Sequence, residues 1–225
     1  MKQIVFDIEA NGLTPDKVWC IVACDIQSGE FTTWSGDDLH CFKDWIKEQD
    51  ELEVIGHNII GYDIPVLEQL LDVDFSKCKV TDTLVMSRLA EPSRQGGHSL
   101  ENWGQLLNQP KGEHSDWDNF SQDMVEYCQQ DVRVNELVYQ RLLRDLANFG
   151  NQSIVLEGQV QRIISKQIKN GWVLDFSWSS THPFLICLLI ILCTSPSSTM
   201  LDFQNLQGQK IIMFNDITNI VRSRS

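Results

Sequence analysis

Two acidic residues near the start of the chain, Asp7 and Glu9, are the first side chains that could do chemistry. They lie in or next to the apolar segment Ile4-Val5-Phe6, which predicts a strand that is buried on both faces. Because side chains alternate along a strand, the two carboxylates point to the same side, about 7 Å apart. Such a pair repels itself unless a cation neutralises it. The alternative is a pair of solvated acids where the strand leaves the core.

Two later segments contain further candidates. Asn58, Tyr62 and Asp63 precede a stretch whose apolar residues recur at helical spacing. Tyr127 and Asp131 are four residues apart in the longest expected helix, so they lie on one face of it. Each residue also has a structural explanation. Asp63 can stabilise a helix N-terminus, Asn58 can be a turn residue, and Tyr127 and Asp131 can be a half-buried ring and an exposed acid.

The elements that must position these residues are those of an α/β fold. The turn residues Ser28-Gly29 indicate that the first three strands form an antiparallel meander, and alternating helices and strands follow. This order predicts a mixed sheet covered by helices. We expect strands at 18–25, 30–34, 53–56 and 79–82, helices after Asp37-Asp38 and Asp63 and at 83–89, 99–107 and 121–149, and a polar loop at 109–118.

Composition narrows the class of protein. A chain of 225 residues, 42% of them hydrophobic, can bury a full core. Its seven cysteines form no CxxC pair, which favours free thiols in a reducing cytoplasm, and Cys20 and Cys24 are expected to pack in the core. No basic, apolar leader opens the chain. The net charge of −13 argues against a wide grip on duplex DNA, but it allows a local site where metal ions carry the positive charge.

The chain changes character near residue 175. Only five charged residues occur among the last 50, and the apolar run at 184–193 has half the length that a membrane-spanning helix needs. No membrane partner is therefore expected. Before this point, helical spacing continues and stops at Asn170-Gly171. We expect three parts, residues 1–150, a helix within 151–175, and a tail at 176–225 that we hypothesise to be non-native in origin.

Taken in order, three motifs resemble those of the DEDD-superfamily exonucleases, tyrosine subgroup. They are Asp7-x-Glu9, Asn58-x-x-x-Tyr62-Asp63 and Tyr127-x-x-x-Asp131. Within this superfamily, the segments 81–89 and 97–104 resemble the proofreading domain of bacteriophage family-A DNA polymerases. The resemblance covers residues 1 to about 148. It implies a ribonuclease-H-like fold and a metal-dependent 3′→5′ exonuclease that acts on single-stranded DNA 3′ ends.

The resemblance also assigns catalytic roles. Four carboxylates from three segments need divalent cations to coexist, and oxygen ligands select hard ions such as Mg²⁺ or Mn²⁺. Two such ions, about 4 Å apart, can stabilise the attacking and the leaving oxygen of a phosphoryl displacement. Tyr127 would orient the attacking water with Glu9, because tyrosine, with an ordinary pKa of about 10, is no base at neutral pH. The implied metal ligands are Asp7, Glu9, Asp63 and Asp131.

Three residues are assigned to the substrate. Leu13 matches a position that wedges against the terminal bases, although a loop residue that caps the core is an equal explanation. Asn58 and Tyr62 would border the single strand. The two histidines that flank the site, His57 and His98, lack metal-ligand spacing and are expected to be structural.

The segment 151–175 resembles the start of a family-A polymerase region, but no polymerase motif follows it. A separate polymerase subunit is therefore a partner to consider. Two alternatives to the DNA exonuclease stay open. One is an exonuclease that trims RNA 3′ ends. The other is a non-catalytic remnant that binds nucleic acid or a polymerase, against which the presence of all four acids argues.

Overall fold

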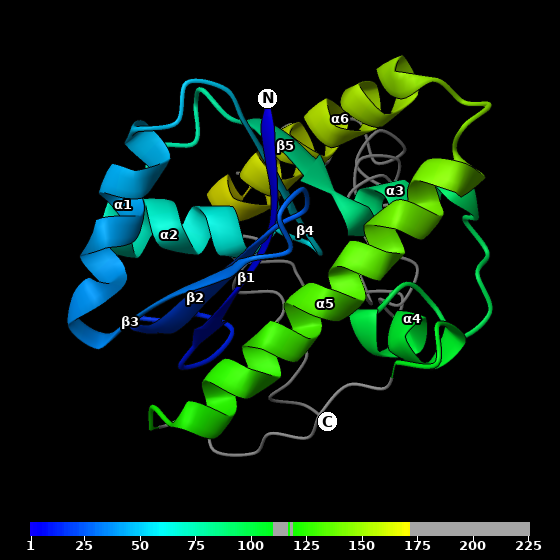
Figure 1. Ribbon diagram of the computed structural model, residues 1–225. Helices are drawn as coiled ribbons and strands as arrows, with labels where there is room; N and C mark the ends of the chain where they lie inside the picture. Colours follow the sequence, from blue (N-terminus) through cyan, green and yellow to red (C-terminus); the bar gives the residue numbers. More distant parts are fainter. Residues whose placement is uncertain (110–116, 118, 172–225) are drawn as a thin grey trace, which may run out of the picture. The chain divides into compact units, whose positions relative to one another are not determined.

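The computed structural model describes residues 1–109, 117 and 119–171 (Figure 1). The chain divides into two compact units, Met1–Ile163 and Ile164–Ser225, and the fold below is that of the first. The expected tail at 176–225 and most of the expected loop at 109–118 lie outside the described residues. The division into 1–150, 151–175 and 176–225 therefore stays a prediction.

The elements are β1 (Lys2–Ala10), β2 (Val18–Asp25), β3 (Phe31–Ser35), the 3-10 helix η1 (Gly36–Asp38), α1 (Leu39–Lys47), β4 (Leu52–Gly56), α2 (Asp63–Leu71), β5 (Lys79–Asp82), α3 (Thr83–Ala90), α4 (Leu100–Leu106), α5 (Gln122–Asp145) and α6 (Asn151–Asn170).

The sheet is mixed, with the strand order β3-β2-β1-β4-β5. β1 pairs antiparallel with β2, and β2 pairs antiparallel with β3, so these strands form the expected meander. On its other side β1 pairs parallel with β4, and β4 pairs parallel with β5. The α/β fold expected from the sequence is therefore confirmed, with β1 as the central strand.

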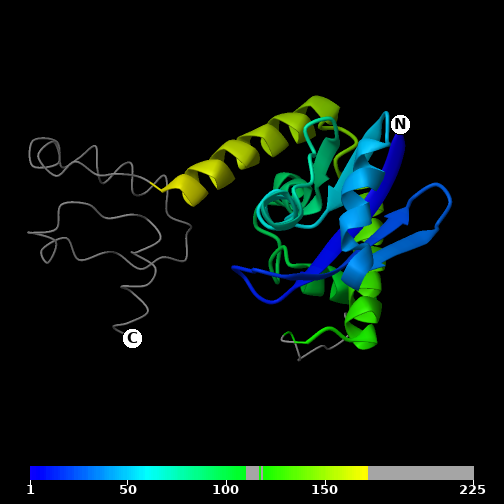
Figure 2. The ribbon, with the colours of Figure 1, turned by 90° about the vertical axis from the view of Figure 1, so that its left-hand side faces the viewer.

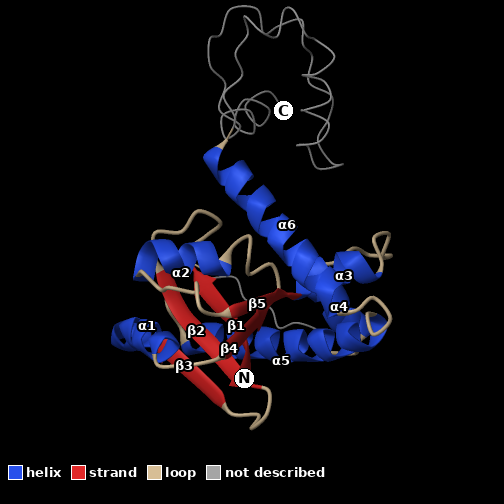
Figure 3. Ribbon diagram, turned by 90° about the horizontal axis from the view of Figure 1, so that it is seen from above, coloured by secondary structure: helices blue, strands red, loops and turns tan. Residues whose placement is uncertain are grey.

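The two faces of β1 belong to two different hydrophobic clusters. Ile4, Phe6 and Ile8 pack in a cluster that includes buried residues of α1 and α2. Val5 packs in a second cluster that is rich in residues of α5. Because side chains alternate, Asp7 and Glu9 share the face of Val5, so they face the layer that contains α5. Figure 3 shows the strands between α2 and α5.

α5 lies along the ladder of β1 and β2 (Figure 2). It begins where the Ser121 hydroxyl accepts a hydrogen bond from the Met124 N–H at 3.2 Å, the usual N-cap arrangement. It ends at Asp145, four residues before the expected end at 149. Residues 146–149 form a turn in which the Phe149 N–H donates to the Leu146 carbonyl, and Gly150 then has a φ of +76°. This left-handed glycine separates α5 from α6, which begins at the next residue, Asn151.

Cys20 and Cys24 are both buried in the second cluster, which confirms their expected packing role. α6 differs from the other long helix, because it has no buried residue. Within the described ranges, we find no helix that has both the length and the apolar character needed to cross a membrane.

Candidate active site

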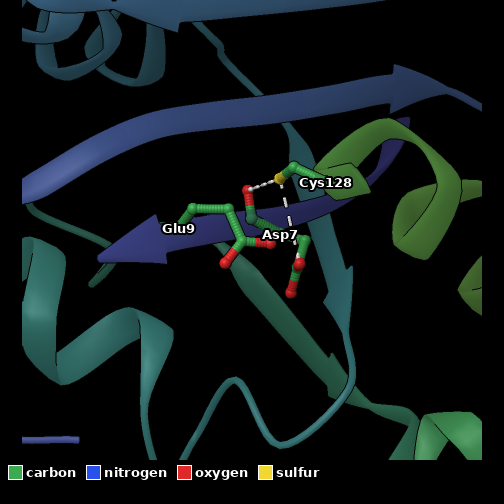
Figure 4. Close-up of side chains that lie close together, drawn as sticks. All are labelled: Asp7, Glu9 and Cys128. Atoms are coloured by element: carbon green, nitrogen blue, oxygen red, sulfur yellow. Dashed lines mark hydrogen bonds between the residues drawn. The ribbon is translucent and has the colours of Figure 1, made fainter. Parts of the chain in front are cut away.

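The acids of β1 form the centre of the site. Asp7 is partly exposed, whereas Glu9 is 7% exposed. One carboxylate oxygen of each acid and the Cys128 sulfur of α5 lie within 4.8 Å of one another. Figure 4 shows the three side chains close together. This is the closest grouping of possible metal ligands among the residues that the structure describes. Asp7 and Glu9 therefore share one side of β1, as the alternation along the first strand predicted, and the structure shows that this side faces α5.

Cys128 is fully buried, and its thiol donates to the Asp7 backbone oxygen at 3.5 Å and lies 3.8 Å from Asp7 Oδ2. Burial raises the pKa of this thiol well above its ordinary value, and the Cys20 thiol and the nearby Asp7 carboxylate raise it further. The sequence reasoning did not include Cys128 in the site. The signal was present, because Cys128 lies three residues before Asp131 and thus near it on the helix face.

Asp63 reaches β1 from the opposite layer. It is the first residue of α2, is 3% exposed, and its carboxylate accepts a hydrogen bond from the Ile8 backbone N–H. This part of β1 is available because its ladder with β4 ends at the pair Val5 and Ile55. Burial raises the pKa of Asp63 to about 7, and the charge of Asp82 adds to this rise, while the Ile8 N–H opposes it. Asp63 thus approaches β1 at the residue between Asp7 and Glu9.

Asp82 holds the loop that leads to Asp63. Its carboxylate accepts the backbone N–H groups of Asn58 at 2.9 Å, Ile60 at 3.1 Å and Leu84 at 2.9 Å. It therefore caps α3 and fixes the loop before α2 at the same time, which stabilises Asn58 at its positive φ of +64°. The buried Asp82 has a raised pKa because burial outweighs these hydrogen bonds. From the sequence, this residue was expected at the end of the strand 79–82 and within the segment 81–89, without a role in the site.

Tyr62 lies among the acids. Its hydroxyl donates to the Gly12 carbonyl oxygen at 2.5 Å. Its pKa is raised to about 12, first by burial and then by the negative charges of Asp63, Glu9 and Asp7. The first and second sequence motifs are thus brought together around this ring.

The other two residues assigned to the substrate lie at the surface. Asn58 is exposed, and Leu13 is 90% exposed on a loop whose ends are joined by the hydrogen bond from the Asn11 N–H to the Lys17 carbonyl oxygen. Leu13 therefore does not cap the core. The alternative explanation offered for it from the sequence is wrong, and its wedge role stays a prediction.

The third motif lies on α5. Asp131 is 4% exposed, and Tyr127 is half-buried with its ring 5.6 Å from that of Trp117 in an edge-on arrangement. The backbone oxygen of Trp117 accepts a hydrogen bond from the Trp19 indole at 3.0 Å. The β1–β2 register shifts between Glu9 and Ala10, so Trp19 is the extra residue of a β-bulge, a device that redirects side chains beside active sites. Sequence reasoning missed both tryptophans, because neither has a diagnostic spacing.

The flanking histidines make hydrogen bonds within the fold. His57 Nδ1 lies 2.9 Å from the Thr83 hydroxyl, and His98 Nδ1 lies 2.8 Å from the Ser87 hydroxyl. These contacts agree with the structural role that was expected for both residues.

The chemistry of this donor set fits divalent cations. Asp7 and Glu9 place carboxylate oxygens close together, and the raised pKa of the buried Asp63 shows that the local surroundings penalise further negative charge. A cation would relieve this penalty. Asp63 and Asp131 do not belong to the group within 4.8 Å, so the complete set of four carboxylate ligands stays a prediction.

The mixed sheet, with acids on its central strand and on the helices of both faces, defines an α/β fold of the ribonuclease-H-like type. Solved structures agree. The structure of Brucella melitensis NrnC with bound Mg²⁺ matches with a TM-score of 0.58 and 19% identity, over 76% of this chain and 86% of that one. The catalytic core of RRP6 from Trypanosoma brucei matches with a TM-score of 0.52 and 18% identity, over 72% of this chain and 45% of that one. At these identities the likeness shows the fold alone, and it confirms the expected ribonuclease-H-like architecture.

The sequence itself is related to phage polymerases. It is 26% identical, over an alignment 234 residues long, to the DNA-directed DNA polymerases of Enterobacteria phage T3 and Escherichia phage T7. Each match covers 76% of this chain, which spans about a third of the length of these relatives, since 33% of each is covered. No family model matches the chain. Together with the fold, this homology confirms the resemblance to the DEDD exonucleases and to the exonuclease region of phage polymerases.

Proposed function

We propose that this chain is a metal-dependent 3′→5′ exonuclease that removes nucleotides from single-stranded DNA ends in a reducing cytoplasm. The observation that carries the proposal is the close pair Asp7 and Glu9 on β1, together with the buried Asp63, which accepts a hydrogen bond from Ile8 of the same strand. Acids from separate elements, held at the end of a buried strand, are a costly arrangement unless they bind cations. The relatives among DNA polymerases favour DNA as the substrate.

Asp7, Glu9, Asp63 and Asp131 would hold two Mg²⁺ or Mn²⁺ ions. When bound, these ions would stabilise the attacking and the leaving oxygen of the displacement at phosphorus. The Mg²⁺ in the structure of NrnC, which has the same fold, supports this choice of cation. The remaining steps belong to the protein. Glu9 and Tyr127 would orient the water that attacks the terminal phosphodiester.

The single strand would be held by rings and by the loop at 11–17. Aromatic side chains bind single strands by stacking on bases without reading their sequence. Trp19 and Trp117 are joined by a hydrogen bond next to Tyr127, and the Lys17 ammonium lies 4.1 Å from the Trp19 ring centre. The exposed Leu13 would wedge against the terminal bases. Asn58 and Tyr62 would border the strand, and a separate polymerase subunit would supply the mismatched ends.

The test is hydrolysis of a single-stranded oligonucleotide labelled at its 5′ end, with Mg²⁺, with Mn²⁺ and with a chelator. We expect stepwise shortening from the 3′ end only in the presence of metal. Asp7→Ala and Asp131→Ala should each lower the rate by a factor of about 10³ or more, because each removes a ligand of the catalytic ions. Neither should unfold the protein, since each relieves repulsion among the acids. Glu68→Ala, an exposed acid of α2, is the matched control and should keep full activity.

Tyr127→Phe should lower the rate less than loss of an acid does, by roughly ten- to a hundredfold, because one orienting hydroxyl is removed while the ring stays. Its kcat and KM are measured with the same oligonucleotide. A loss as large as that of Asp7→Ala would assign Tyr127 a different role.

The same assay distinguishes the two alternatives. An RNA oligonucleotide of the same sequence, degraded faster than the DNA, would make the chain an RNA-trimming exonuclease. Binding of either strand in Mn²⁺ without any shortening would make it a non-catalytic binding protein and would overturn the proposal.

A further inference from the structure

A thiol lies beside the acids that are proposed to bind the catalytic ions. The sulfur of Cys128 and carboxylate oxygens of Asp7 and Glu9 lie within 4.8 Å of one another (Figure 4). The three residues come from two elements, β1 and α5, which pack together through one hydrophobic cluster. The grouping is therefore held by the core of the protein rather than by a surface loop.

This donor set differs from one made of carboxylates alone. Oxygen ligands suit Mg²⁺ and Mn²⁺, whereas a thiolate selects softer cations such as Zn²⁺ and Cd²⁺. We propose that Asp7, Glu9 and Cys128 form a binding site for a thiophilic divalent cation, which competes there with the hard ion of the exonuclease. The proposal rests on the proposed function only in taking Asp7 and Glu9 as metal ligands.

The geometry needs only a small adjustment. Zinc bonds are about 2.3 Å to sulfur and about 2.0 Å to carboxylate oxygen, so neighbouring ligand atoms lie about 3.5 Å apart in a tetrahedral site. The Cys128 sulfur already lies 3.8 Å from Asp7 Oδ2. Three protein ligands would leave a fourth position for water or for a substrate oxygen.

Binding of the cation replaces the S–H bond of Cys128 by a bond between sulfur and the cation. The S–H bond of Cys128 breaks, a bond from sulfur to the cation forms, and the proton leaves to the solvent, so no oxidant or reductant is needed. Burial disfavours the free thiolate, but the charge of the cation compensates the negative sulfur, as it does in other metal–thiolate sites. Mg²⁺ gains little from this exchange because it prefers oxygen. The thiol therefore discriminates between the two kinds of cation.

The test uses Co²⁺ as a spectroscopic probe on the full chain. Thiolate bound to Co²⁺ gives a charge-transfer absorption in the near ultraviolet, which carboxylate ligands do not give. We expect this absorption in the unmodified protein, its loss in Cys128→Ser, and its persistence in Cys41→Ser, an exposed cysteine of α1. Asp7→Asn should retain the absorption but require a higher Co²⁺ concentration to reach it.

Zn²⁺ affinity, measured by displacement of Co²⁺, should fall at least about tenfold in Cys128→Ser, since even indirect support of a metal ligand is worth that much. Cys128→Ala gives a second variant without a buried hydroxyl, and circular dichroism verifies that each variant folds. An absorption that is unchanged in both folded variants would overturn the proposal, as would Zn²⁺ affinity equal to that of the unmodified protein.

These outcomes are independent of the exonuclease assay. A Co²⁺ band that depends on Cys128, together with no hydrolysis in Mg²⁺ or Mn²⁺, would leave the metal site standing and reject the proposed function. Hydrolysis in Mg²⁺ without such a band would support the proposed function and reject the thiophilic metal site.

Discussion

The carboxyl group of Asp63 combines burial, a helix N-terminus and a backbone hydrogen bond. The helix start and the Ile8 N–H both favour the ionised form, yet burial prevails and raises its pKa to about 7. Desolvation is thus the larger effect at this position. The folded protein binds this proton more tightly than the unfolded chain, in which an aspartate titrates at about 3.9.

This shift predicts a dependence of stability on pH in the metal-free protein. Because the pKa of Asp63 is higher in the folded state, its contribution to stability falls as the pH rises from about 4 to about 7, and then stays constant. Asp63→Asn keeps the shape and an oxygen acceptor but carries no charge. In chelator at pH 8 it should be more stable than the unmodified protein by on the order of 2 to 4 kcal/mol, since one pKa unit is about 1.4 kcal/mol.

The measurement is urea unfolding at several pH values. The difference between Asp63→Asn and the unmodified protein should disappear near pH 4. A difference that does not vary between pH 4 and pH 8 would contradict the raised pKa. Asp74→Asn, an exposed acid, serves as the control and should show no gain at pH 8.

At the scale of elements, the junction of β4 and α2 decides where Asp63 lies. β4 ends at Gly56, and the loop that follows turns back tightly enough for Ile59 to pack at this glycine. A Cβ at position 56 would lie 1.9 Å from Ile59 Cγ2 and 3.0 Å from the Phe6 backbone oxygen. Asp82 then fixes the same loop through the N–H groups of Asn58 and Ile60. The packing of Ile59 at Gly56 and the hydrogen bonds of Asp82 therefore fix the loop between β4 and α2. This loop positions Asp63 next to β1.

Gly56→Ala should thus destabilise the fold and weaken activity together. Overpacking of this kind costs about 1 to 3 kcal/mol, and the displaced Ile59 lies in the loop just before α2. Gly158→Ala on α6 is the matched control, because a Cβ there meets nothing within 4 Å. It should stabilise its helix by about 0.5 to 1 kcal/mol and leave hydrolysis unchanged. Thermal unfolding and the oligonucleotide assay measure both effects, and equal behaviour of the two variants would contradict the argument.

At the scale of the whole molecule, the site and both hydrophobic clusters belong to the unit Met1–Ile163. The matches to the phage polymerases likewise cover 76% of the chain, and none of the residues proposed for catalysis follows Asp131. We therefore expect that the proposed exonuclease activity needs no residue from the expected tail at 176–225.

A fragment of residues 1–171 should accordingly fold and hydrolyse single-stranded DNA. Its kcat/KM is expected to lie within about threefold of that of the full chain, which corresponds to less than about 1 kcal/mol in the activation barrier, because no residue proposed for catalysis is removed. Its circular dichroism spectrum and oligonucleotide hydrolysis are the measurements. An unfolded or inactive fragment, beside an active full chain, would show that later residues complete the fold or the site.

The local parts of this protein follow from the sequence alone. Alternation along the first strand is enough to place Asp7 and Glu9 on one face, and helical spacing is enough to align Tyr127 with Asp131. The strand at 18–25 was predicted with its correct bounds for the same reason, since its apolar residues and flanking turn are local signals. Helix ends were less accurate, because the turn at 146–149 depends on Gly150 and on packing rather than on the apolar stripe.

Only the tertiary structure decided what surrounds these residues. The contact of Cys128 with Asp7 joins positions 121 residues apart, and no local period encodes such a distance. The β-bulge at Trp19, whose indole donates a hydrogen bond to the Trp117 backbone oxygen, arises from strand pairing. The raised pKa of Asp63 arises from desolvation between packed layers. Periodicity along a chain determines which face a side chain shares, whereas packing between elements determines its neighbours, its dielectric surroundings and hence its chemistry.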